Sequence, residues 1–216
     1  MDVAIAGGRG QVGLRLGRLL GERGDRARGL IRHEGQADHL REVGVEPVVC
    51  DLEGACDPVV AIAGADALVF AAGAGPGSGP DRKWTVDYAA AAKLIVAARV
   101  AGVRRYLMLS AMGTDNPPEG NEVFAIYLRA KARADAELRA SGLDWTIVRP
   151  GLLTDDPGTG QVQAAESVDR GEIPRDDVAA TLLAVLDEPG TVGLTFEVVG
   201  GDTPIREAVA ALVSAG

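Results

Sequence analysis

The stretch VAIAGGRGQVGLRL, residues 3–16, decides the fold, because four glycines within seven residues join two apolar segments. The run Val3–Ala6 is typical of a buried strand, and the pattern Gln11–Glu22 is typical of a helix. A glycine turn between them favours nucleotide binding, since glycine lets the backbone approach a pyrophosphate at the helix N-terminus. A turn that serves only strand–helix packing is the alternative. The loop residues predicted to hold the nucleotide are Gly7, Gly8, Arg9, Gly10, Gln11, Val12 and Gly13.

The rest of the chain alternates short apolar runs with longer amphipathic ones. Runs that are hydrophobic on both faces and separated by crossover helices are what a buried parallel sheet requires. Right-handed crossovers then give an α/β fold with a doubly wound parallel sheet, the Rossmann fold. The apolar runs are Val3–Ala6, Ala27–Ile31, Pro47–Cys50, Ala67–Ala72, Arg105–Leu109 and Trp145–Val148, and the helical patterns are Gln11–Glu22, Gln36–Val43, Pro58–Ala63, Asp81–Ala101 and Glu122–Ala140.

The C-terminal third carries helix signals but little sign of a second domain. Pro174 precedes a helical pattern, and Thr203 is predicted to cap a last helix with Pro204 at its first position. The segment Gly151–Gly171 is rich in Gly, Asp and Thr, so we expect a loop that forms part of a substrate lid. We therefore expect one NAD(P)-binding domain over residues 1–216, in which residues 151–216 form a small substrate-side region.

The ends of the second and third predicted strands bear on the choice of cofactor. NAD enzymes usually carry an acid at the end of the second strand, for the ribose hydroxyls. Here Arg32 stands near that position, and Arg9 lies in the glycine loop. Two guanidinium groups suit a 2′-phosphate, so NADP is predicted rather than NAD, although either arginine alone could be a solvated surface charge. Asp51 is placed to meet the adenine or to cap a turn, and the further cofactor contacts predicted beside it are Leu52, Ala71, Ala72 and Gly73.

A candidate reaction centre lies in the next part of the chain. Tyr127 and Lys131 are four residues apart in a helical pattern and share a face, and Ser110 ends the fifth predicted strand. A neighbouring ammonium and an oxidised nicotinamide would lower the pKa of the phenol, so that Tyr127 could act as acid and base. Ser110 would donate to the same substrate oxygen, and Lys131 would also hold the nicotinamide ribose. Tyr and Lys four apart also occur by chance, and Tyr127 could belong to the core.

Five motifs in order, GGRGQVG, the Asp51 strand end, LMLSAMG, YLRAK and WTIVRPGLL, resemble the short-chain dehydrogenase/reductase superfamily. The chain is most similar to its atypical, extended-like branch of epimerase/dehydratase-like, NmrA-like and biliverdin-reductase-B-like proteins. The resemblance implies that Asp87 is a further active-site residue, although it could instead order water or cap a helix. It also implies that Pro150 and Gly151 border the nicotinamide.

These motifs favour an NADP-dependent oxidoreductase that acts on a small carbonyl, alcohol or quinone-like compound. A non-catalytic NADP-binding redox sensor is the alternative, because the branch keeps its Ser, Tyr and Lys unevenly. A sugar epimerase or dehydratase is a weaker alternative, because the chain lacks most of a substrate domain.

Composition excludes several other classes of function. The net charge is −9 without a basic cluster, which argues against nucleic acid as a ligand.

We expect a cytoplasmic protein without a membrane segment, with Cys50 and Cys56 as buried thiols rather than a disulfide. His33 and His39 lack companions at metal-ligand spacing, so no metal site is predicted. The long helical patterns could form a homodimer face.

Overall fold

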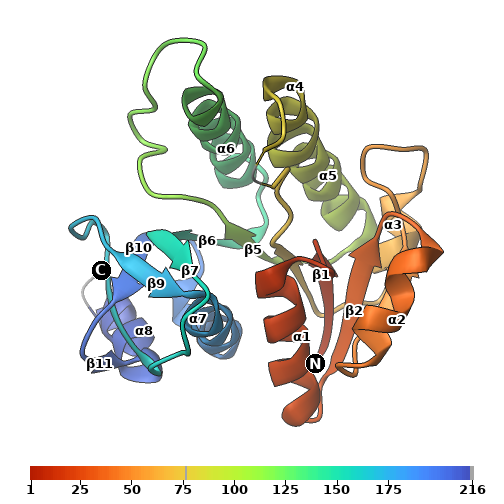
Figure 1. The fold of residues 1–216 in the computed structure, drawn as a ribbon. Coiled ribbons are helices and arrows are strands. Elements are labelled where there is room, and N and C mark those ends of the chain that lie inside the picture. Colours follow the sequence, from red (N-terminus) through yellow and green to blue (C-terminus); the bar gives the residue numbers. More distant parts are fainter. Residues whose placement is uncertain (76, 215–216) are drawn as a thin grey trace.

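A computed structural model describes residues 1–75 and 77–214 (Figure 1). Within these residues the strands are β1 (Asp2–Ala6), β2 (Arg26–Ile31), β3 (Glu46–Val49), β4 (Ala67–Phe70), β5 (Arg105–Leu109), β6 (Asp144–Pro150), β7 (Leu152–Thr154), β8 (Gln161–Ala165), β9 (Glu172–Pro174), β10 (Thr195–Gly200) and β11 (Thr203–Pro204). The helices are α1 (Gln11–Glu22), α2 (Ala37–Arg41), α3 (Pro58–Ile62), α4 (Pro80–Arg82), a π-helix (Lys83–Ala90), α5 (Ala91–Ala101), α6 (Val123–Arg139), α7 (Arg175–Asp187) and α8 (Ile205–Ser214), with short 3₁₀ helices at Glu34–Gln36 and Pro189–Thr191.

The central sheet confirms the predicted doubly wound fold. Among the described residues its strand order is β11-β8-β10-β6-β5-β4-β1-β2-β3. The strands from β10 to β3 in this order run parallel, and β8 is antiparallel to both of its neighbours, β10 and β11. β1 pairs with β2 on one side and with β4 on the other, so the strand order reverses there. In open α/β sheets, ligands bind outside the carboxyl ends of the strands at such a reversal.

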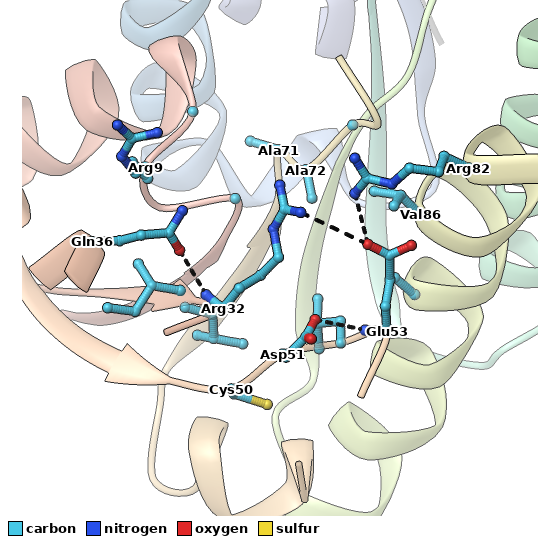
Figure 2. A pocket seen from close by; sticks show the side chains of 17 residues that line it. Arg9, Arg32, Gln36, Cys50, Asp51, Glu53, Ala71, Ala72, Arg82 and Val86 are labelled. Atoms are coloured by element: carbon cyan, nitrogen blue, oxygen red, sulfur yellow. Dashed lines mark hydrogen bonds and ion pairs between the residues drawn. The ribbon is translucent and has the colours of Figure 1, made fainter. Parts of the chain in front are cut away.

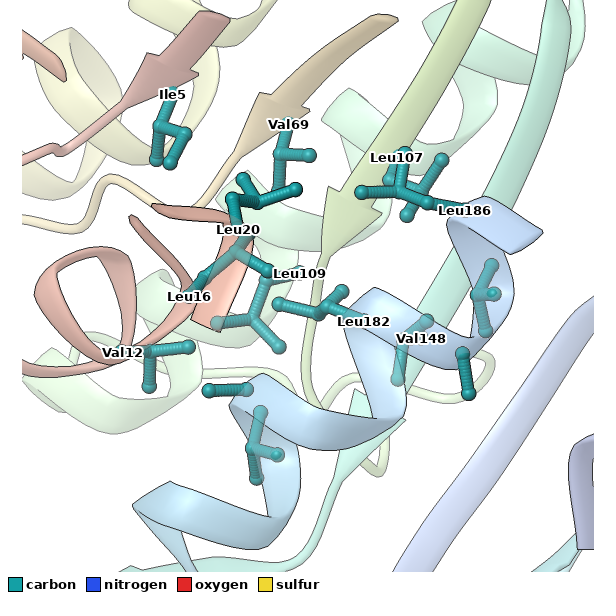
Figure 3. Packing of buried hydrophobic residues seen from close by; sticks show 14 of the residues in the cluster. Ile5, Val12, Leu16, Leu20, Val69, Leu107, Leu109, Val148, Leu182 and Leu186 are labelled. Carbon is teal, nitrogen blue, oxygen red and sulfur yellow. The ribbon is translucent and has the colours of Figure 1, made fainter. Parts of the chain in front are cut away.

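Two helical layers cover the sheet, one on each face (Figure 1). On one face α1 and α7 pack side by side over β1, β4, β5 and β6, where Leu16 and Leu182 are fully buried (Figure 3). On the other face α5 and α6 bury Leu94 and Leu138. Burying one such leucine contributes about 1.5–3 kcal/mol. This packing holds the carboxyl ends of the central strands at one edge of the molecule.

The C-terminal third contributes more sheet than the sequence indicated. Residues 151–171, expected to form a loop, include β7 and β8, and β8 pairs antiparallel with β10. β10 itself joins the sheet parallel to β6. The prediction of a long loop was wrong because β8 is a half-exposed strand. Polar residues interrupt its apolar ones, so its sequence lacks the apolar run that indicated the other strands. Thr203 and Pro204 form β11 against β8, and α8 begins at Ile205, so the predicted cap and first helical position were also wrong.

The two cysteines are joined in a disulfide, so the prediction of free thiols was wrong. Cys50 directly follows β3 and Cys56 lies six residues later, and the turn between them brings their Cα atoms to 5.1 Å. That separation suits a disulfide. The sequence argument used only the redox compartment and did not consider that the chain turns back at this point.

Within the described residues no helix is long and apolar enough to cross a membrane.

Candidate functional site

The glycine turn after β1 leaves the N-terminus of α1 open to a ligand. Gly10 is the N-cap and provides no side-chain cap, and the first turn carries no acidic residue. Gly7 has a φ of 83°, and a Cβ on it would lie 2.7 Å from the Ala72 backbone. A helix N-terminus with unsatisfied N–H groups and close backbone approach is a site for an anion such as pyrophosphate. The residues therefore fit the pyrophosphate of a dinucleotide.

The other two glycines of the loop have a packing role. A Cβ on Gly8 would lie 2.5 Å from the Gly29 Cα in β2, and a Cβ on Gly13 would lie 2.4 Å from the Gly7 carbonyl oxygen. Neither residue lines the cavities described below, although the sequence assigned both to the cofactor. Gly8 and Gly13 hold the loop against β2 and α1, and so position Gly7 and Gly10.

A first cavity of about 220 Å³ opens at the ends of β1, β2, β3 and β4 (Figure 2). It brings together nine of the predicted cofactor residues, Gly7, Arg9, Gly10, Arg32, Asp51, Leu52, Ala71, Ala72 and Gly73. Asp51 lines the cavity and also shapes its own turn, because its Oδ1 accepts from the Glu53 N–H at 3.1 Å. The sequence missed Gln36, Glu53 and Arg82, which line the same cavity.

A second cavity of about 620 Å³ contains the predicted reaction centre. It shares Gly10 and residues 71–73 with the first cavity, so the two meet along the ends of β1 and β4. The remaining predicted site residues line it, namely Gln11, Val12, Asp87, Ser110, Tyr127, Lys131, Pro150 and Gly151. A dinucleotide can therefore extend from the first cavity into the second.

Lys131 is buried and held by three oxygen atoms. Its Nζ donates to the Leu109 carbonyl at 3.0 Å and to the Ala72 carbonyl at 3.4 Å, and it lies 3.7 Å from Asp87 Oδ1. Burial lowers the pKa of the Lys131 ammonium and raises the pKa of the Asp87 carboxyl. Asp87 Oδ1 is buried without a hydrogen-bond partner among the described residues, which leaves one acceptor beside the second cavity.

Tyr127 does not have the lowered pKa that the sequence led us to expect. Burial raises its pKa above the ordinary value, and the charges of Asp87 and Asp135 raise it further. The expected lowering by Lys131 is missing because that ammonium is turned to Asp87 and to backbone carbonyls. Another ammonium, Lys83 Nζ, lies 5.5 Å from the centre of the Tyr127 ring. Tyr127 is therefore a protonated phenol at neutral pH in the protein alone.

Ser110 belongs to a buried polar network that the sequence did not reveal. Its Oγ donates to Asp135 Oδ2 at 3.0 Å, and Arg149 donates to the same oxygen through Nη2 at 3.1 Å. Arg149 also donates to the exposed Asp115 at 2.6 Å. Asp135 follows Lys131 by four residues, as Lys131 follows Tyr127, so the helical spacing was an available signal. The network fixes the Ser110 side chain at the cavity.

The described residues around the two cavities do not form a set of metal ligands. Across residues 1–75 and 77–214 no group of three or more His, Cys, Asp or Glu side chains could hold a metal ion.

The fold and the two joined cavities define a dinucleotide-binding protein of the Rossmann type. The chain belongs to the NAD(P)H-binding family, whose model matches residues 7–189. It is 44% identical over 211 residues to the uncharacterized sugar epimerase YhfK of Bacillus subtilis, which covers 97% of this chain and 99% of that protein.

Two solved structures are similar over nearly the whole chain. A putative NAD-dependent epimerase/dehydratase from Bacillus halodurans has a TM-score of 0.93 at 40% identity, covering 98% of this chain and 100% of that one. The oxidoreductase ylbE from Lactococcus lactis has a TM-score of 0.86 at 27% identity, covering 99% of this chain and 97% of that one. The protein is thus NAD(P)-binding and its family is oxidoreductase-like.

Proposed function

We propose that the protein is an NADP-dependent oxidoreductase that acts on a small carbonyl, alcohol or quinone-like compound. The supporting observation is that Ser110, Tyr127, Lys131 and Asp87 line one cavity, which is continuous with the glycine turn. A bound reduced nicotinamide supplies a hydride. The other requirements for reducing a carbonyl are a proton for its oxygen and polar groups that orient it.

Tyr127 is the proposed proton donor. Its phenol lines the cavity, and its raised pKa keeps the proton available at neutral pH. Lys131 from α6 and Asp87 from the π-helix form a buried ion pair in the same cavity and orient the ligand there. Ser110 is the second group at the substrate oxygen; its hydroxyl is held by Asp135 and rotates to donate when a carbonyl binds.

The preference for NADP rests on the first cavity. Arg9 and Arg32 both line it, and guanidinium groups bind phosphate oxygens through paired hydrogen bonds. Thermal shift with NADP⁺ and with NAD⁺ tests this choice, because a ligand stabilises the native state according to its affinity. Greater stabilisation by NAD⁺ at equal concentration would contradict the proposal.

Turnover is tested with Tyr127→Phe, using NADPH and a panel of carbonyl and quinone compounds. Removing the phenolic proton donor should lower kcat by about 10²–10⁴-fold. Tyr88→Phe is the matched control, since the Tyr88 hydroxyl donates to Glu137 at 3.1 Å and lines neither cavity. Equal rates for wild type and Tyr127→Phe would remove Tyr127 as the acid.

A second candidate is a non-catalytic NADP-binding redox sensor. The observation that favours it is the state of the reaction centre, in which Lys131 is paired with Asp87 and the Ser110 hydroxyl donates its hydrogen bond to Asp135. Absence of turnover with every compound of the panel, together with tight NADP⁺ binding, would favour the sensor.

A further inference from the structure

Three arginines from separate segments surround the first cavity. Arg9 comes from the glycine turn, Arg32 from the end of β2, and Arg82 from α4 on the opposite side of the cavity. The sequence pointed to Arg9 and Arg32, whereas Arg82 lies 50 residues beyond Arg32 in a segment that carries no cofactor motif. The fold thus adds a third guanidinium group to this end of the groove.

A carboxylate of the protein itself lies between two of these arginines. Arg82 Nη2 donates to Glu53 Oε2 at 2.7 Å, and Arg32 Nη1 lies 4.0 Å from the same oxygen. Figure 2 shows both guanidinium groups directed at the Glu53 carboxylate. The Glu53 side chain is 26% exposed, so the pair is open to solvent and to a ligand. One oxygen atom with a guanidinium group on each side is the arrangement in which arginines bind a phosphate.

Two further contacts keep Glu53 in this position. Thr85 Oγ1 donates to Glu53 Oε1 at 2.6 Å, and the Glu53 N–H donates to Asp51 Oδ1 at 3.1 Å. The disulfide between Cys50 and Cys56 closes the turn that carries Glu53. The Arg82 guanidinium lowers the pKa of the Glu53 carboxyl, so the group is negative at neutral pH. Glu53 is therefore a fixed anion in the region where the proposed function places a 2′-phosphate.

A fixed anion there acts differently on the two dinucleotides. A 2′-phosphate is a dianion that must share Arg32 with the Glu53 carboxylate and is repelled by it, whereas a ribose hydroxyl meets no such repulsion. Arg82 reduces the repulsion by pairing with Glu53. Arg32 holds Glu53 only at 4.0 Å, and its own side chain is 54% exposed, so it is the guanidinium group free to turn to a phosphate.

We propose that Glu53 is a specificity-determining residue which limits the affinity for NADP relative to NAD, and that Arg82 restrains and neutralises it. This inference rests on the proposed binding of a 2′-phosphate beside Arg32. It assigns opposite effects to two residues that form one ion pair.

The test measures dissociation constants of NADP⁺ and NAD⁺ by calorimetry for wild type, Glu53→Gln and Arg82→Gln. Removing the Glu53 charge should shift the affinity ratio toward NADP⁺ by about tenfold, and Arg82→Gln should shift it toward NAD⁺ by about threefold. Glu46→Gln is the matched control, because Glu46 pairs with Arg26 at 2.6 Å and lies outside both cavities. Glu46→Gln makes the same change in net charge as Glu53→Gln and should leave the ratio of the two affinities unchanged.

If Glu53→Gln does not fold, Thr85→Val replaces it, since that change frees the carboxylate from its hydroxyl partner without altering charge. The freed carboxylate should then turn toward Arg32 and lower the affinity for NADP⁺, while the affinity for NAD⁺ stays unchanged. An unchanged ratio in Glu53→Gln, or a shift toward NAD⁺, would overturn the inference. A wild type that prefers NAD⁺ but gains NADP⁺ affinity in Glu53→Gln would instead refute the proposed cofactor and support the role of Glu53.

Discussion

Substitution of Gly13 by alanine tests whether the glycine turn is a fixed piece of packing or a flexible loop. The new Cβ would lie 2.4 Å from the Gly7 carbonyl oxygen and 3.2 Å from its carbon. Both are backbone atoms, so no side chain can rotate away. Reaching ordinary contact requires a movement of about 1 Å between the start of α1 and the turn, in a closely packed region.

The cost of that movement falls on both stability and binding. Overpacking of this kind costs about 1–3 kcal/mol, and the better helix propensity of alanine offsets about 1 kcal/mol of it. Because the atoms in the way are backbone atoms, the cost lies in the upper part of that range, about 2–3 kcal/mol. We therefore expect the free energy of unfolding to fall by about 1–2 kcal/mol, which lowers Tm by roughly 2–8 °C for a chain of this size. The same movement displaces Gly10 and the N–H groups of α1, so NADP⁺ should bind at least about tenfold more weakly.

Gly21 in the same helix provides the control. A Cβ there meets no atom within 4 Å, so Gly21→Ala should raise the free energy of unfolding by about 0.5–1 kcal/mol and leave NADP⁺ affinity unchanged. Urea unfolding and calorimetric titration measure the two effects for both variants. Wild-type stability and affinity in Gly13→Ala would refute the reasoning, because the turn would then move without cost.

Three other predictions concern the reaction centre and its surroundings. The kcat for carbonyl reduction should show no loss of the Tyr127 proton below about pH 10, since the folded pKa is raised; a fall with a midpoint near pH 7 would contradict this. Asp135→Ala should lower the free energy of unfolding in urea by about 3 kcal/mol, because Arg149 loses its buried partner, whereas Asp115→Asn on the exposed side of Arg149 should cost less than about 1 kcal/mol. Cys56→Ser should cost about 2 kcal/mol of stability and weaken NADP⁺ binding, and a reducing agent should bring the wild type to the same values.

The part of the fold that the sequence predicts is the part with local signals. β1, the glycine turn and α1 were expected within a residue of their observed bounds, because strand period, glycine and helix period follow one another without interruption. The doubly wound parallel sheet was predicted from the alternation of apolar runs and helical patterns with right-handed crossovers, and the order of its strands comes from the structure. β8 and β11 could not be found in this way, since a two-residue or half-polar strand gains its stability from the neighbour it pairs with.

The candidate site likewise contains residues that local signals predicted and residues that they did not. The strand ends predicted the positions of Arg32 and Ser110, because parallel strands bring their carboxyl ends to one edge. They did not predict Glu53 or Asp135 as partners of these residues, since each partner comes from a separate segment. The helical repeat Tyr127, Lys131, Asp135 was a visible signal that a carboxylate shares the face of the tyrosine, and the motif YLRAK ends before it.

The carboxylate partners of the reaction centre change its predicted chemistry, although its residues lie together as predicted. A motif with Tyr127 and Lys131 suggests an ammonium that favours phenolate, but Asp87 lies 3.7 Å from that ammonium and two carboxylates raise the pKa of the phenol. At neutral pH this phenol is protonated, so it can donate to a developing alkoxide, whereas accepting a proton from an alcohol requires the phenolate. We therefore expect kcat for alcohol oxidation to rise as the pH increases above 7, while kcat for carbonyl reduction stays constant up to about pH 10. Measuring both rate constants between about pH 6 and pH 10 with one substrate pair decides the point, and an oxidation rate constant that no longer rises above pH 7 would show that bound cofactor reverses the effect of Asp87.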